Sequence, residues 1–197
     1  METREKRYTI VVFTENNFGL LNRITIIFSR RRINIESMTV SETERKGISR
    51  FTIVIVLDNN LIKPLIKQIR KIVGVLSVFQ NEEDQVITSQ IAFYKIATKN
   101  PGEREKVMDI ALRHHCRITF SNEQYIVVEK TGNEDELLTM LHLFEPLSVQ
   151  EFVKSGRIAV VRNQQRLEQY AKNLEPEGWY SLDEFHENNH TKNYSSY

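Results

Sequence analysis

The spacing of apolar residues changes period along the first 80 positions of the chain. Residues 8–14 alternate β-branched and aromatic side chains, which is typical of a strand. Over 19–31 the apolar residues recur at intervals of three and four, which predicts an amphipathic helix. Two further strands are predicted at 33–42 and 50–57, with a turn at 44–47 between them.

A second helix and a fourth strand complete this unit. Asp58 or Asn59 can cap the helix, whose apolar residues again recur at helical spacing. We expect Pro64 in its first turn, where a proline is tolerated, and Gly74 at its end, before a strand at 75–79. The resulting order, β-α-β-β-α-β, is the ferredoxin-like pattern.

The same order is predicted again after an acidic break. The expected strands are 88–97, 117–121, 125–130, 149–154 and 157–161, and the expected helices are 102–115 and 135–144. We therefore predict an α+β protein of two consecutive ferredoxin-like βαββαβ domains, at 1–80 and 87–163, joined by a linker at 81–86. Residues 164–197 are rich in Asn, Gln, Glu, His and Tyr, and are expected to form one short helix and then a mobile, partly disordered tail.

Two strands of the first unit carry apolar residues on both faces. In a four-stranded sheet with both helices on one face, the other face can be polar. Val54 and Val56 nevertheless lie opposite the remaining apolar residues of their strand, and Val11 and Phe13 do the same in the first strand. Both faces therefore need cover, which another subunit, the second domain or a partner protein must supply.

Composition excludes several classes of function. The net charge of +1 provides no field to attract nucleic acid or an anionic membrane. No apolar run approaches the roughly 20 residues that span a bilayer, and the charged start does not resemble a signal peptide. Cys116 is the only cysteine, so an internal disulfide is excluded. We expect a cytoplasmic protein that binds neither nucleic acid nor membrane.

The loop before the first helix offers groups suited to a free amino acid. Asn16 precedes Gly19, where the unsatisfied backbone N–H groups of a helix start favour a carboxylate. Asn34 follows the helix, and asparagine amides can bind an ammonium or a carboxylate. The group contains no nucleophile, general base or metal ligand, so we interpret it as a binding pocket. The equivalent loop of the second half contains Pro101, which removes a backbone donor, and no amino-acid site is expected there.

Three other polar clusters have simpler structural interpretations. His114-His115-Cys116 has no second set of zinc ligands elsewhere in the chain. The arginines at 30–32 lie at a helix C-terminus, where cations interact favourably with the helix dipole. The acidic residues at 82–84 are expected to be a solvated linker.

The motifs of the first half resemble those of one family. They are Glu-Asn-x-x-Gly-x-Leu-x-Arg at 15–23, Phe-Ser-x-Arg at 28–31, Asn-Ile-Glu-Ser-x-Thr-Val at 34–40 and Ser-Arg-x-Thr-Ile at 49–53. This combination is similar to the ACT domain of the regulatory (small) subunit of acetohydroxyacid synthase, also called acetolactate synthase. A looser similarity continues through the second half to the segment 153–157, Val-Lys-Ser-Gly-Arg.

This resemblance implies a non-catalytic regulatory chain. Such subunits dimerise through the ACT domain and bind a branched-chain amino acid, usually valine, between two ACT domains. They bind a separate catalytic large subunit, raise its activity and confer feedback inhibition in valine, isoleucine and leucine biosynthesis. Thiamine diphosphate, magnesium and FAD would belong to that large subunit, and this chain would bind none of them.

The resemblance also implies an effector site in this chain. The family's ligand-binding residues fall on Asn16, Gly19 and Asn34, and we extend the predicted site to their neighbours Asn17, Phe18, Leu20, Leu21 and Ile35. The family usually has glycine where this chain has Arg32, and a left-handed conformation there would cost about 1 kcal/mol. Which branched-chain amino acid binds stays open at this point.

Two alternatives are compatible with the sequence. The first is a free-standing ACT-domain amino-acid sensor that regulates another enzyme or a transcription factor. The second is a small acyl-phosphate hydrolase on a ferredoxin-like fold, using Arg23 and Asn16. Co-purification of a large thiamine-dependent synthase would distinguish the regulatory subunit from both.

Overall fold

The computed structural model describes residues 5–162, so the short helix and tail predicted for 164–197 lie outside the described residues. The first half comprises β1 (Glu5–Glu15), α1 (Leu20–Arg30), β2 (Ile35–Glu42), β3 (Ile48–Asp58), α2 (Asn59–Ile69) and β4 (Val75–Glu82). The predicted βαββαβ order is confirmed here. The interval 81–86, predicted as a linker, contains the end of β4, a single 3₁₀ turn η1 (Glu83–Gln85) and the start of the next strand.

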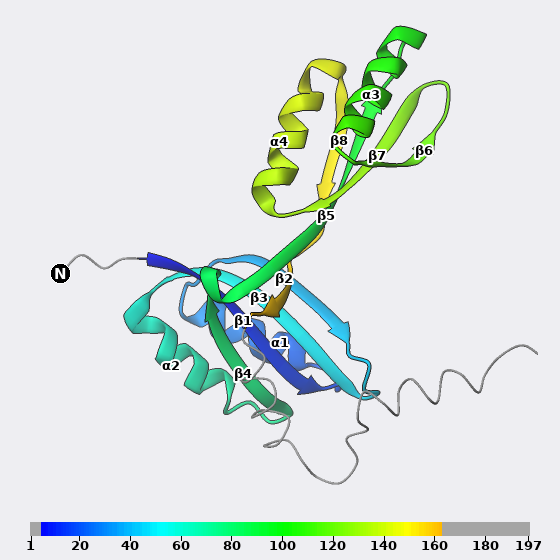
Figure 1. The fold of residues 1–197 in the computed structure, drawn as a ribbon. Helices are drawn as coiled ribbons and strands as arrows, with labels where there is room; N and C mark the ends of the chain where they lie inside the picture. Colours follow the sequence, from blue (N-terminus) through cyan, green and yellow to red (C-terminus); the bar gives the residue numbers. More distant parts are fainter. Residues whose placement is uncertain (1–4, 163–197) are drawn as a thin grey trace, which may run out of the picture. The chain divides into compact units, whose positions relative to one another are not determined.

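The second half repeats the order and adds a short final strand. It comprises β5 (Val86–Ala97), α3 (Pro101–Arg113), β6 (Arg117–Ser121), β7 (Tyr125–Gly132), α4 (Glu134–Phe144), a 3₁₀ turn η2 (Glu145–Leu147), β8 (Val149–Lys154) and β9 (Ile158–Val161). Figure 1 shows the two α/β units, with α1 and α2 in the first and α3 and α4 in the second.

The sheet of the first half has the strand order β2-β3-β1-β4, and each neighbouring pair is antiparallel. The alternating pattern sends Ile10 and Val12 of β1, with Ile53 and Ile55 of β3, into one core. Both helices of this half contribute buried residues to the same core. The helices therefore cover one face of this sheet, as the apolar spacing predicts.

The second sheet has the order β6-β7-β5-β8, and its central strand β5 is shared between two sets of partners. Residues 90–97 of β5 pair with β7, whereas residues 86–89 pair with β9. The core under α3 and α4 is built around Tyr94, whose ring centroid lies 5.4 Å from that of Phe144 and 5.2 Å from that of Phe152.

The face of the first sheet that the helices leave free is covered in part by the end of the second half. Val11 and Val54 on this face are 3% and 0% exposed, whereas Phe13 is half-buried and Val56 remains 37% exposed. The Thr39 hydroxyl donates to the Arg157 carbonyl at 3.0 Å, and the Arg50 guanidinium donates to the Ala159 carbonyl at 2.5 Å. Of the three sources of cover considered from the sequence, these contacts identify the chain's own second half.

The position of Pro64 differs from the prediction. The Asp58 carboxylate accepts a hydrogen bond from the Asn60 N–H at 2.8 Å, and this cap fixes the start of α2 at Asn59. Pro64 is consequently the sixth residue of α2 and lies beyond its first turn, where it removes the hydrogen bond to the Asn60 carbonyl. Four buried apolar residues hold this helix on the sheet despite that loss: Ile62, Leu65, Ile66 and Ile69.

Candidate functional site

The start of α1 presents backbone N–H groups that have no acceptor within the helix. Gly19 is its N-cap residue and has φ 82° and ψ −5°, a left-handed conformation that glycine adopts without strain. Among residues 5–162 no side chain caps this end, and the first turn of the helix contains no acidic residue. A Cβ at Gly19 would meet nothing within 4 Å. Backbone N–H groups at this helix start are therefore free to bind a carboxylate.

Backbone hydrogen bonds from two neighbouring loops hold the segment before α1. The Glu15 N–H donates to the Gly74 carbonyl at 2.9 Å, and the Asn16 N–H donates to the Gly47 carbonyl at 2.8 Å. The Asn17 amide donates to the Glu15 carboxylate at 2.7 Å. The backbone of the loop is thus fixed, while the side chain of Asn16 remains exposed.

The apolar residues predicted for the site divide into two groups. Phe18 is fully exposed, at 103%, and Leu21 is 50% exposed. Leu20 is only 3% exposed and packs toward Gly74, so its side chain belongs to the core. Of the apolar residues predicted for the site near the start of α1, Phe18 and Leu21 are therefore the ones that can offer an apolar surface to a ligand.

Asn34 and Ile35 lie beyond the opposite end of α1. This helix has 11 residues and is therefore about 16 Å long. Asn34 is exposed and directly precedes β2, whereas Ile35 is the first residue of β2 and packs against the core. The structure consequently does not bring Asn34 together with Gly19 within one chain.

The turn between α1 and Asn34 is a Schellman motif with arginine at the position that usually holds glycine. Arg32 has φ 55°, the left-handed conformation considered from the sequence. Its N–H donates to the Ser29 carbonyl at 3.1 Å, and the Ile33 N–H donates to the Phe28 carbonyl at 2.9 Å. Ile33 also packs against the core cluster that contains Phe28. The chain thus keeps the motif's hydrogen bonds and bears the strain of a side chain at φ above zero.

The corresponding helix start in the second half supplies its own partners. The Asn100 side chain accepts a hydrogen bond from the Glu103 N–H at 2.9 Å, and the Glu103 carboxylate accepts one from the Lys99 N–H at 2.8 Å. Pro101 occupies the first turn and has no N–H to offer. This end of α3 therefore differs from the uncapped end of α1.

The remaining clusters do not assemble a second site. Within residues 5–162 no group of three or more His, Cys, Asp or Glu side chains is placed to hold a metal ion. Burial raises the pKa of the Cys116 thiol above its usual range, which disfavours the thiolate. Arg31 at the end of α1 donates to the Gln68 side chain at 2.8 Å. In the part of the chain described, no helix is long and apolar enough to cross a membrane.

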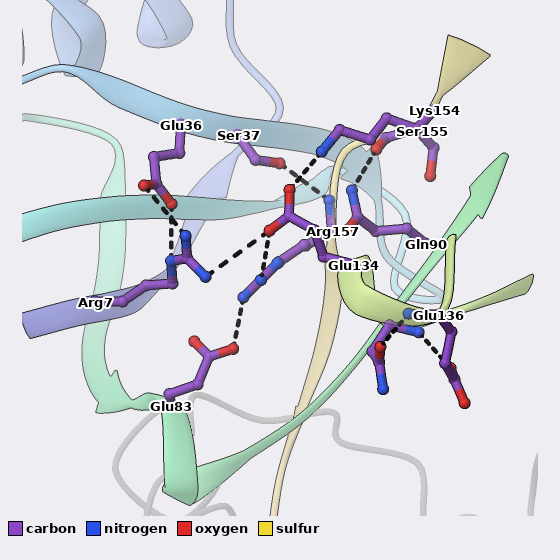
Figure 2. Close-up of polar contacts among 11 residues, drawn as sticks. Arg7, Glu36, Ser37, Glu83, Gln90, Glu134, Glu136, Lys154, Ser155 and Arg157 are labelled. Atoms are coloured by element: carbon purple, nitrogen blue, oxygen red, sulfur yellow. Dashed lines mark hydrogen bonds and ion pairs between the residues drawn. The ribbon is translucent and has the colours of Figure 1, made fainter. Parts of the chain in front are cut away.

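Sequence reasoning missed a network of ion pairs that joins the two halves. Arg157, whose side chain is 7% exposed, contacts the Glu83 carboxylate at 2.8 Å and the Glu134 carboxylate at 3.2 Å (Figure 2). Glu82 also pairs with Lys6, at 2.8 Å, so two of the acidic residues at 82–84 form ion pairs that the sequence did not indicate, while their side chains stay 41% and 47% exposed. Their cationic partners lie more than 70 positions away in the chain, so no local pattern could indicate them.

Comparison with known families matches both halves of the chain. A family model described as an AHAS small subunit-like ACT domain matches residues 10–77. A second model, described as the small subunit of acetolactate synthase, matches residues 89–163. Both halves are thus covered by models of the same kind of subunit.

Individual relatives agree with these models. The acetolactate synthase small subunit of Mycobacterium leprae is 32% identical over 155 residues, covering 79% of this chain and 91% of the relative. A probable acetolactate synthase small subunit of Archaeoglobus fulgidus is 30% identical over 160 residues, covering 81% of this chain and 99% of the relative. The small subunit of Bacillus subtilis is 30% identical over 158 residues, covering 80% and 91%.

A solved structure supports the fold. The crystal structure of the acetolactate synthase small subunit from Thermotoga maritima matches with a TM-score of 0.73 and 22% identity, covering 80% of this chain and 98% of that one. Together with the two matched models and relatives that are at least 30% identical over most of their length, these results show that the chain belongs to the acetolactate synthase small-subunit family.

Proposed function

We propose that this chain senses a branched-chain amino acid, with valine as the first candidate, and regulates an acetolactate synthase. It would activate the catalytic large subunit and confer feedback inhibition on it, in the biosynthesis of valine, isoleucine and leucine. Thiamine diphosphate, magnesium and FAD would be held by the large subunit. The observation that carries this proposal is the separation of Asn16 and Gly19 from Asn34 by the whole length of α1.

That separation is resolved by a second copy of the chain. A two-fold axis that sets α1 antiparallel to its counterpart brings Gly19 of one copy beside Asn34 of the other. Within the described residues β2 pairs only with β3, so its outer edge is open to strand pairing. Pairing of β2 with β2 of a second copy would continue the sheet and place the two half-sites at the interface.

Each group of this composite site has a defined role. The free N–H groups at Gly19 and the first turn of α1 would bind the effector carboxylate, which the helix dipole also favours. The Asn34 amide of the second copy would accept a hydrogen bond from the ammonium. The exposed side chains of Phe18 and Leu21 would contact a branched aliphatic side chain.

Calorimetry with the isolated chain tests the site. Asn34→Ala should weaken valine binding by about 0.5–1.5 kcal/mol, because one hydrogen bond to the ligand is lost. Asn60→Ala removes another exposed asparagine, at the start of α2, and should leave the affinity unchanged. Equal affinities for the wild type and Asn34→Ala would contradict the assignment.

Co-purification tests the partner. A large thiamine-dependent synthase should be recovered with this chain, and its activity should rise on reconstitution and fall when valine is added. Recovery of a different enzyme or a transcription factor would favour the free-standing sensor instead.

A further inference from the structure

The strand β2 connects the candidate effector site to the second half of the chain. Asn34 directly precedes β2, and the pairing of β2 with β3 shifts register between Ile35 and Ser37. Such a bulge bends the strand and re-aims the side chains beside it. Glu36 is the residue at the bulge. Its carboxylate lies 2.9 Å from Nε of Arg7 on β1, so the two side chains form an ion pair, although Nε itself makes no hydrogen bond.

Immediately after the bulge, two side chains of β2 hold the backbone of Arg157 from both sides. The Arg157 N–H donates to Oγ of Ser37 at 3.0 Å, and Oγ1 of Thr39 donates to the Arg157 carbonyl at 3.0 Å. Side chains two apart in a strand lie on the same face, so Ser37 and Thr39 contact Arg157 together, and a shift of β2 would move both contacts at once.

Gly156 makes the contact with β2 tight. A Cβ at this position would lie 3.1 Å from both the Met38 carbonyl oxygen and Oγ of Ser37, and closer still to Oγ1 of Thr39. The segment before it is anchored in the second sheet, because Oγ of Ser155 accepts a hydrogen bond from the N–H of Ile91 at 3.0 Å. There is no room for β2 to shift here without displacing this segment.

The guanidinium of Arg157 extends the connection to the second half. It pairs with Glu83 in η1 and with Glu134, the first residue of α4 (Figure 2). Glu134 also pairs with Nζ of Lys154 at 2.5 Å and lies 3.8 Å from Arg7. One carboxylate at the start of α4 thus meets cations from β1, from β8 and from the segment held by β2.

We propose that Arg157 is the positioning residue through which effector binding at Asn34 acts on the second half of the chain. The proposal rests on the proposed function, since it takes Asn34 as an effector contact. The effector favours one arrangement of the bulge between Ile35 and Ser37. That arrangement sets Ser37 and Thr39 against Arg157 and, through its guanidinium, orients α4.

Two variants test this connection, with a matched control. Arg157→Met keeps the buried volume while removing the ion pairs; Glu134 retains Lys154, and Glu83 is exposed enough to be solvated. Thr39→Val removes the hydroxyl that donates to the Arg157 carbonyl, and valine is nearly the same size as threonine. Arg162→Met changes an exposed arginine five positions further along the same segment and is the control.

The measurements are valine affinity by calorimetry, with and without the catalytic subunit, and valine inhibition of the reconstituted synthase. Arg157→Met and Thr39→Val should bind valine within about twofold of the wild type when alone. Both should require at least about tenfold more valine for half-inhibition, and the catalytic subunit should no longer alter their valine affinity, because coupling is reciprocal. Arg162→Met should behave as the wild type.

The outcomes separate the two proposals. Normal inhibition in both Arg157→Met and Thr39→Val would overturn the role of Arg157 while leaving the effector site intact. If Arg157→Met does not fold, normal inhibition in Thr39→Val alone overturns it. Failure of the wild type to bind valine would overturn the proposed function, and this connection with it.

Discussion

Replacing Arg32 by glycine should stabilise the protein. Arg32 is exposed and left-handed, at φ 55°, within a turn whose two hydrogen bonds are already formed. A non-glycine residue in this conformation costs about 1–2 kcal/mol. The greater freedom of glycine in the unfolded chain offsets about 0.4–1 kcal/mol of that. The net gain expected for Arg32→Gly is therefore about 1 kcal/mol, or about 2–4 °C in Tm for a chain of this size.

The measurement is urea unfolding without effector at one fixed protein concentration, because dimerisation would otherwise contribute to the apparent stability. The midpoint should rise while the slope stays constant. Arg30→Gly is the matched control, since it makes the same change two positions earlier in the last turn of α1, where the backbone is helical. It should destabilise the protein by about 1 kcal/mol. Equal effects of the two substitutions would refute the assignment of strain to Arg32.

Three further results are expected. Gly19→Asp should abolish valine binding, because it adds a carboxylate where the carboxylate of the ligand would lie and strains the backbone at φ 82°. Stimulation of the synthase should persist, and valine binding that calorimetry still detects in this variant would contradict the prediction. Valine should raise Tm and the dimer fraction at low concentration, and a monomer in sedimentation with valine present would argue against the composite site. Glu134 is held below its usual pKa by Lys154, chiefly through a hydrogen bond, and by the charges of Arg157 and Arg7. The stabilising contribution of the Glu134 carboxylate should be complete above the ordinary pKa near 4.5 and lost as pH falls through the lower folded pKa. In a plot of the urea midpoint against pH, Glu134→Gln should therefore reduce the decrease on the acid side.

Periodicity located the helices and strands because that information is local. Alternation in β1 and the helical spacing of α1 each follow from which face a residue buries, and the structure confirms both. The prediction for Pro64 was wrong because a helix capped by Asp58 starts at Asn59 and makes Pro64 its sixth residue, and a cap at Asn59 would still have made it the fifth, beyond the first turn.

Only part of the candidate site could be predicted from the sequence. The uncapped start at Gly19 is a local feature and was predicted, whereas the distance from it to Asn34 depends on the length of α1 and points to a second copy. Arg157 was missed because nothing near it in the chain distinguishes a buried arginine from a solvated one. Its partners Glu83 and Glu134 come from elements separated from it by 74 and 23 positions.

The cover on the first sheet has a consequence for biosynthesis of the chain. The segment that lies over the face bearing Val11 and Val54 includes Arg157, whose carbonyl accepts a hydrogen bond from Thr39, 118 positions earlier in the chain. A ribosome delivers the N-terminal half first, so a nascent chain that stops short of Gly156 presents these valines to solvent. Such long-range closure is slow to form and exposes apolar surface to aggregation or to chaperones in the meantime. The half of the chain that is synthesised first thus obtains its cover only after the end of the second half has been made.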